Sequence, residues 1–91
     1  MKRQLLVVEN NLGLHARAAA RLVRLASGFE SEIFLSREGA GQTIDCKSIL
    51  GVLMLAASKG SRLEVTVAGG DEDAALEAIE GLFRGKFGEA S

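Results

Sequence analysis

Alternation between hydrophobic and polar residues predicts four strands in this chain. Residues 63–67 alternate strictly, which is typical of a strand with one buried face. Apolar runs within 2–8 and 32–36 predict two further strands. The glycine-containing turn 38–41 joins 32–36 to a strand at 42–45, and we expect these two strands to form a hairpin.

Apolar residues spaced by three or four positions predict three helices. The first begins at Ala16 and ends at Ser27-Gly28, where Gly28 is expected to take the left-handed conformation. Its apolar face is predicted to consist of Ala16, Ala19, Ala20, Leu22, Val23 and Ala26. Residues 49–57 have no polar side chain on any face of a helix, so this second helix is either wholly buried or offers one side to a partner. The last helix follows Asp71 and carries acidic residues in its first turn, which suits the helix dipole.

The order of these elements predicts an α+β fold. Strand, helix, strand, strand, helix, strand and helix follow one another, which favours a two-layer open-faced β-sandwich. We expect a four-stranded, largely antiparallel sheet with three helices on one face. No linker, repeat or low-complexity segment interrupts the pattern, so residues 1–91 are predicted to form a single domain.

The composition excludes several classes of function. The net charge is −1, whereas a protein that binds duplex DNA usually has a strong basic excess, so we expect no nucleic-acid partner. One His and one Cys do not build a zinc site, and the lone Cys46, expected to be a half-buried thiol, makes no internal disulfide. No apolar run is long enough for a signal peptide or a membrane helix. We therefore expect a cytoplasmic protein with no membrane insertion, no cofactor and no metal.

The only histidine lies where the first helix is predicted to begin. A neutral imidazole is a nucleophile near pH 7, and the free N–H groups of a helix start together with Arg17 favour an anion beside His15. These residues predict a nucleophile next to an anion-binding site. A structural interpretation stands beside it, in which His15 caps the helix and Arg17 is a solvated charge. The chain has no second histidine and no Cys–His pair with usable spacing, so a hydrolase is poorly supported.

Two motifs resemble those of one family. The segment 13–17, Gly-Leu-His-Ala-Arg, closely resembles the active-site motif of HPr, the histidine-containing phosphocarrier family of the bacterial phosphotransferase system. The segment 47–52, Lys-Ser-Ile-Leu-Gly-Val, is similar to the family's signature around its regulatory serine. Residues 57–60, Phe83 and 87–89 also fit. The resemblance covers essentially the whole chain in the same order of elements.

The resemblance implies a phosphoryl relay in which the protein is a carrier and not an enzyme. Enzyme I would phosphorylate His15, which matches the histidine that the family phosphorylates on Nδ1, and the phosphoryl group would then pass to an enzyme IIA domain. Arg17 matches the arginine beside the phosphate. Ser48 matches the serine that HPr kinase/phosphorylase phosphorylates in some lineages, although a serine before a helix can also be a simple N-cap.

The resemblance also implies a docking surface on a protein that we expect to be monomeric. Arg21 and Arg24 share the helix face of Arg17 and are suited to steering acidic partners, although a solvated helix face remains an open interpretation for Arg21. The expected docking residues are Ala20, Arg21, Arg24, Ile49, Leu50 and Leu53. For Val52, Leu55 and Ala56 we expect core packing instead.

Position 18 departs from the family's pattern. The motif usually continues with proline after the arginine, whereas this chain has Ala18. Alanine keeps a high helix propensity but does not fix the backbone as proline does, so we expect a slightly looser first turn. The departure leaves open, beside the main carrier role, a regulatory or nitrogen-branch paralogue that acts by protein binding. A separate alternative is a small α/β interaction domain in which His15 is purely structural.

Overall fold

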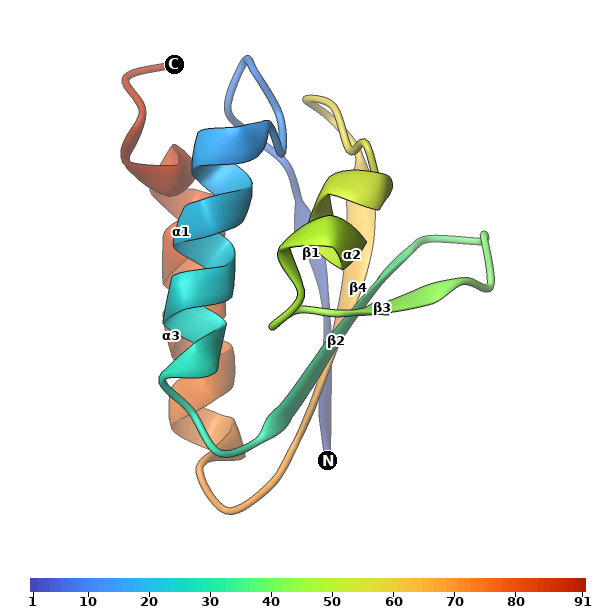
Figure 1. Cartoon of the computed structure of the whole chain (residues 1–91), viewed down its shortest axis with the longest axis vertical. Coiled ribbons are helices and arrows are strands. Elements are labelled where there is room, and N and C mark those ends of the chain that lie inside the picture. The colour runs from blue at the N-terminus through green and yellow to red at the C-terminus, as the bar shows by residue number, and fades with distance from the viewer.

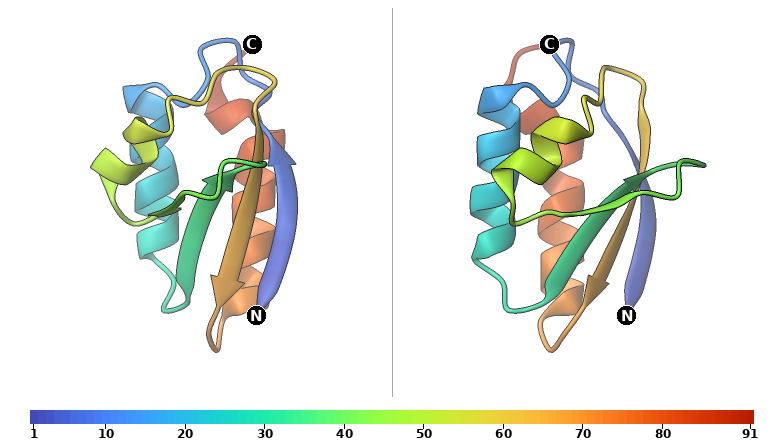
Figure 2. Two further views of the ribbon diagram at one scale, coloured as in Figure 1. Left: turned by 90° about the vertical axis from the view of Figure 1, so that its right-hand side faces the viewer. Right: turned by 45° about the vertical axis from the view of Figure 1, so that its right-hand side comes forward.

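A four-stranded antiparallel sheet carries three helices on one face (Figures 1 and 2). The computed structural model describes residues 1–91. Its elements are β1 (Lys2–Val7), α1 (Ala16–Ser27), β2 (Glu32–Arg37), β3 (Thr43–Asp45), α2 (Ile49–Met54), β4 (Arg62–Ala68), α3 (Glu72–Arg84) and the 3₁₀ turn η1 (Lys86–Gly88). The strand order is β1-β4-β2-β3, and every neighbouring pair is antiparallel. The predicted fold class is confirmed, including the β2–β3 hairpin, and the sheet is wholly antiparallel.

None of the helices is long and apolar enough to cross a membrane.

Strand β4 joins the two halves of the sheet. Its alternating sequence places Leu63, Val65 and Val67 on the buried side, each with no exposed surface, while Glu64 and Thr66 face outward. β4 pairs with β1 on one side and with β2 on the other. The hydrophobic core of 21 buried residues therefore lies between one face of the sheet and the helices.

The buried face of α1 differs from the predicted one. Ala18, Ala19, Leu22 and Ala26 are wholly buried, whereas Ala16 is exposed. The predicted face left out Ala18, which is buried because α1 packs against both α2 and α3. Ala18, the residue that departs from the family's pattern, is therefore a core residue.

The end of α1 also differs from the prediction. Gly28 has φ −77°, a right-handed conformation, and not the left-handed one expected. Its N–H donates to the Leu25 carbonyl at 3.1 Å, and the next N–H, from Phe29, donates to Ala26 at 3.1 Å. The chain thus leaves the helix through a right-handed turn that satisfies these carbonyls without a left-handed residue.

The apolar run 49–57 is neither all helix nor all core. Helix α2 ends at Met54, and Val52 is its only buried residue. Ala56, predicted to be a core residue, is exposed and has φ +48°. This left-handed residue turns the chain, so that Leu55 before it and Ala57 after it are buried in its place.

Cys46 is wholly buried and not half-buried as predicted. Burial, and secondarily the negative charge of Asp45, raises the pKa of the thiol to about 12. The thiol therefore stays protonated at neutral pH and is a small core side chain without nucleophilic reactivity.

The segment that follows α3 returns to the start of α1 (Figures 1 and 2). The buried ring of Phe87 packs against Phe83, with ring centroids 4.9 Å apart. Arg21 donates from Nη1 to the Phe87 carbonyl and is half-buried. The guanidinium of Arg21, an expected docking residue, therefore also holds this segment in place.

Candidate functional site

The loop before α1 is held against the segment between α2 and β4. Gly13 has φ +67°, and an added Cβ would lie 2.4 Å from the Ala57 carbonyl oxygen, so the close approach requires glycine. Leu14 is buried and donates its N–H to the same Ala57 oxygen at 2.8 Å. The loop therefore delivers His15 to the N-terminus of α1 in a fixed position.

His15 is the N-cap of α1 and makes contacts through both ring nitrogens. Its Nδ1 accepts a hydrogen bond from the Arg17 backbone N–H at 3.3 Å. Its Nε2 lies 2.5 Å from Oε2 of Glu89. The side chain retains 26% of its exposure, so the ring edge is accessible to a partner protein.

Glu89 and Asn10 belong to the site, and no role was predicted for either. Nδ2 of the wholly buried Asn10 donates to Oε1 of Glu89 at 2.9 Å and to the Gly13 carbonyl at 2.8 Å. The hydrogen bond from Asn10, and then that with His15, holds the pKa of the Glu89 carboxyl below its usual range. Glu89 lies 74 positions from His15 and 79 from Asn10, so no local pattern in the sequence signals these contacts.

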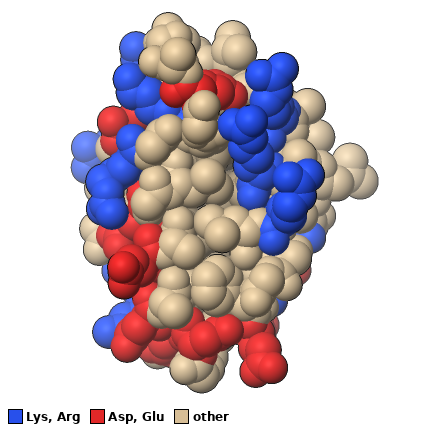
Figure 3. All heavy atoms as spheres, turned by 90° about the vertical axis from the view of Figure 1, so that its left-hand side faces the viewer, with Lys and Arg blue, Asp and Glu red and all other residues tan.

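A hollow of about 550 Å³ lies beside Glu89, whose carboxylate contacts His15. Arg17, Arg21 and Glu89 line it, together with Leu12, whose side chain is largely exposed. Basic side chains also run along the α1 side of the helical face, while most of the acidic ones lie toward the opposite end, with a smaller acidic patch near the top (Figure 3). The hollow thus combines two arginines with the carboxylate of Glu89, in a chain that is nearly neutral overall.

Ser48 is the N-cap of α2, as its sequence position predicted. Its Oγ accepts a hydrogen bond from the Gly51 N–H at 3.1 Å, and its backbone is extended. The side chain is half-buried. The serine thus has a structural role whether or not it is modified.

The predicted docking residues of α2 form an exposed apolar surface beside α1. The exposed fractions are 70% for Leu50, 40% for Ile49 and 37% for Leu53. Met54, 72% exposed, extends this surface and was not predicted, although it belongs to the same apolar run. These four residues are called the α2 apolar surface below. Arg24 is exposed on α1, and Ala20 is half-buried.

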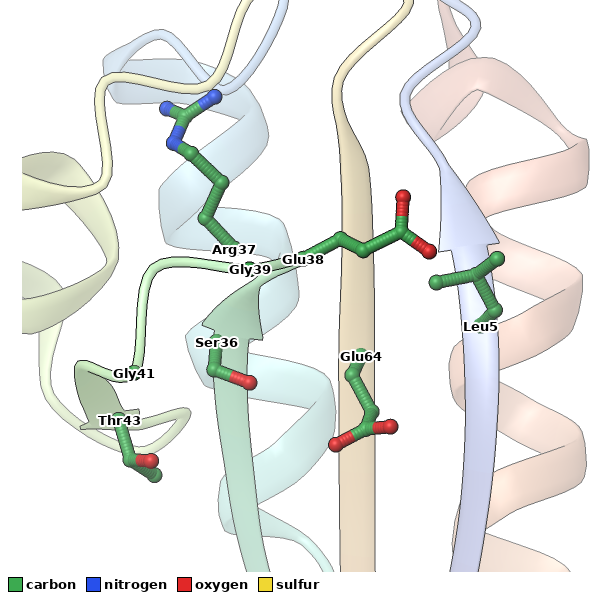
Figure 4. Close-up of a pocket in the computed structure, with 8 residues that line it drawn as sticks. All are labelled: Leu5, Ser36, Arg37, Glu38, Gly39, Gly41, Thr43 and Glu64. Carbon is green, nitrogen blue, oxygen red and sulfur yellow. The ribbon is translucent and has the colours of Figure 1, made fainter.

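A second hollow, of about 310 Å³, lies on the outer face of the sheet (Figure 4). Its two carboxylates already have partners, because Glu38 pairs with Arg62 at 2.8 Å and Glu64 with Arg3 at 3.7 Å. The guanidinium of Arg37 points away from it and binds the Leu55 carbonyl (Figure 4). This hollow therefore offers no free positive charge to an anion.

Comparison with known proteins agrees with this arrangement. The family model "PTS HPr component phosphorylation site" matches residues 2–85. The chain belongs to the HPr family. The phosphocarrier protein HPr of Xylella fastidiosa (strain 9a5c) is 46% identical to it over 84 residues, 92% of each protein. The phosphocarrier protein NPr of Escherichia coli (strain K12) is 38% identical over 87 residues, 96% of each. A crystal structure of HPr-C-His from Thermoanaerobacter tengcongensis matches over 100% of both chains, with a TM-score of 0.94 and 36% identity.

Membership of the HPr family fixes the general role. The chain is a phosphocarrier of the phosphotransferase system. The small, open site suits this role, since a carrier must present one group to several larger partners in turn.

Proposed function

We propose that the chain accepts a phosphoryl group from enzyme I on Nδ1 of His15 and passes it to an enzyme IIA domain. One observation supports Nδ1 as the phosphorylated atom. Nδ1 accepts the Arg17 N–H at 3.3 Å, so its lone pair lies in the ring plane toward the start of α1. That is the end of a helix at which a negatively charged phosphoryl group is favoured.

The transfer needs little from the carrier beyond positioning. The lone pair of Nδ1 forms the new bond to phosphorus, and the bond between phosphorus and the donor breaks with its electron pair going to the donor. The Arg17 N–H loses its acceptor when Nδ1 is phosphorylated and is then free to donate to a phosphoryl oxygen. The guanidinium of Arg17, a residue that lines the neighbouring hollow, is of a type suited to bind a second oxygen.

The proposal is tested by supplying the two reactants. The protein is incubated with phosphoenolpyruvate and a bacterial enzyme I, and its intact mass is measured before and after acid treatment. We expect a gain of one phosphoryl group that acid removes and that a bacterial enzyme IIA accepts. No mass gain with an enzyme I that phosphorylates a known HPr would overturn the proposal.

We further propose that both partners dock on the α2 apolar surface, with Ala20, Arg21 and Arg24 at its border. Replacing Leu50 with glutamine is expected to raise the KM for phosphorylation by enzyme I about tenfold, because a central apolar contact is worth more than about 1 kcal/mol. Stability is expected to stay unchanged, since Leu50 is 70% exposed. The matched control is Val7→Gln, which changes an apolar residue on the outer face of the sheet that is 39% exposed. Equal KM values for the two variants would contradict this docking surface.

Ser48 is the proposed site of regulatory phosphorylation. A phosphate on its Oγ lies at the start of α2, which tolerates negative charge, but beside Ile49 and Leu50, where it weakens docking of partners that need an apolar surface. With ATP and an HPr kinase, we expect an acid-stable phosphoryl adduct that Ser48→Ala removes and the exposed-serine control Ser58→Ala retains. Loss of the N-cap in Ser48→Ala should also cost about 1 kcal/mol of stability. An adduct that persists in Ser48→Ala would refute the assignment.

The nitrogen branch is the second candidate. The relative named NPr matches 96% of the chain, but at 38% identity against 46% for the relative named HPr, so we favour the sugar branch. Phosphorylation rates with the enzyme I of each branch distinguish the two.

A further inference from the structure

We propose that Glu89 is a positioning residue for His15. Its carboxylate keeps the ring proton on Nε2, leaves the lone pair on Nδ1, and offsets the positive charge that the ring acquires on phosphorylation. The second part rests on the proposed function; the first concerns the free protein alone.

The tautomer follows from the two contacts of the ring. An ionised carboxylate only accepts hydrogen bonds, so the 2.5 Å contact between Oε2 of Glu89 and Nε2 of His15 places a proton on Nε2. A backbone N–H only donates, so the contact from Arg17 to Nδ1 requires a lone pair there. Both contacts select the same neutral tautomer, which is the one with Nδ1 as nucleophile.

The carboxylate is itself held in place. Asn10 presents its Nδ2 to two acceptors, the Gly13 carbonyl and Oε1 of Glu89, so the orientation of its amide is unambiguous. On the other side Phe87 is buried, and Gly88 passes so close to Arg21 that an added Cβ would lie 2.7 Å from Nη1. Glu89 is thus fixed from both sides.

The charge argument follows from the same geometry. When Nδ1 bonds to phosphorus while Nε2 keeps its proton, both ring nitrogens are substituted and the ring carries a positive charge. A carboxylate at 2.5 Å compensates this charge as it develops, which is what the aspartate does for the histidine in serine protease triads. The low pKa of Glu89 means that this carboxylate is ionised at neutral pH.

Replacement by glutamine gives a distinctive test. Asn10 donates to Oε1, so the amide oxygen of Glu89→Gln must take that place and the amide NH₂ then faces Nε2 of His15. Because the NH₂ group of the glutamine can only donate, Nε2 of His15 must accept this hydrogen bond. The ring proton then moves from Nε2 to Nδ1. The isosteric variant is therefore expected to be worse than Glu89→Ala, which removes the carboxylate but leaves the Arg17 contact.

The experiment measures tautomer and rate separately. The ¹⁵N shifts of the His15 ring in the free protein report the tautomer, and we expect Nε2–H in the wild type and a predominant Nδ1–H form in Glu89→Gln. With enzyme I, kcat is expected to fall about 10-fold in Glu89→Ala and about 100-fold in Glu89→Gln, with KM nearly unchanged. The control is Glu77→Gln, which removes an exposed carboxylate on α3.

The order of the variants decides between positioning and mere packing. If Glu89 only packs the end of the chain, the isosteric glutamine variant will behave as the wild type and alanine will be the worse variant. That order, or wild-type ring shifts in Glu89→Gln, would overturn the proposal. If enzyme I leaves the wild type unmodified, the phosphocarrier assignment of His15 fails, while the ring shifts still decide whether Glu89 sets the tautomer.

Discussion

Replacing His15 with asparagine is expected to abolish phosphoryl uptake and to leave the fold intact. The amide oxygen of asparagine can accept the Arg17 N–H as Nδ1 does, and asparagine is among the best N-cap residues, so the free energy of unfolding should change by less than about 0.5 kcal/mol. Asparagine has no nucleophilic lone pair for phosphorus. The rate of phosphorylation by enzyme I should therefore fall by at least about 1,000-fold. Intact mass against time measures the rate, and urea unfolding measures the stability.

A second variant separates the nucleophile from the cap. His15→Ala removes both, so it should show the same loss of uptake with an added loss of about 1 kcal/mol in stability. An acid-labile phosphoryl group on His15→Asn would refute His15 as the acceptor. The same stability for the two variants would refute the capping role of the residue.

Replacing Gly13 with alanine is expected to be the most destabilising of the changes considered. Alanine is strained at φ +67°, and its Cβ would lie 2.4 Å from the Ala57 oxygen and 2.9 Å from Cα of Ser58, both backbone atoms that cannot rotate away. We expect a loss of at least about 2 kcal/mol in the free energy of unfolding. The Leu14–Ala57 hydrogen bond, at 2.8 Å, should weaken as the loop moves out, and with it the position of His15.

Gly60 provides the matched control for this variant. It also has a positive φ, +90°, but an added Cβ meets nothing within 4 Å. Gly60→Ala should therefore show the cost of the backbone conformation alone, about 1 kcal/mol. The difference between the two variants measures the clash. If Gly13→Ala is no more harmful than Gly60→Ala, the loop is not held against Ala57 in solution.

The sequence predicted the elements well because their signals are local. The alternating residues of β4 indicate a strand with one buried face without reference to any distant residue. The acidic residues in the first turn of α3 likewise indicate the start of that helix through its own dipole. His15 was placed at a helix start from the residues around it, and the same position explains both its capping contact and its access to partners. Ser48 was placed in the same way.

The contacts that complete the site could not be predicted from local pattern. Glu89 reaches His15 only because Phe87 enters the core and Arg21 holds its carbonyl, and these residues are far apart in the chain. The same limit explains why Arg21 was expected only as a docking residue, with no sign in the sequence of its contact with the Phe87 carbonyl. Ala56 and Gly28 were misassigned for a different reason: both depend on how the chain leaves a helix, which is set by the tertiary contacts of the next residues.

The shallow attachment of α2 has a consequence for how partners are accommodated. A helix of six residues is too short to be stable by itself, and this one is held by the Ser48 cap and by one buried side chain, that of Val52. Its local opening therefore costs much less than global unfolding, and its backbone amides should exchange with deuterium ahead of those of α1 and α3. The loop that carries His15 is anchored separately, through Gly13 and Leu14. Under the proposed docking, partners of different shape would reshape α2 on contact while the loop keeps the His15 ring in place.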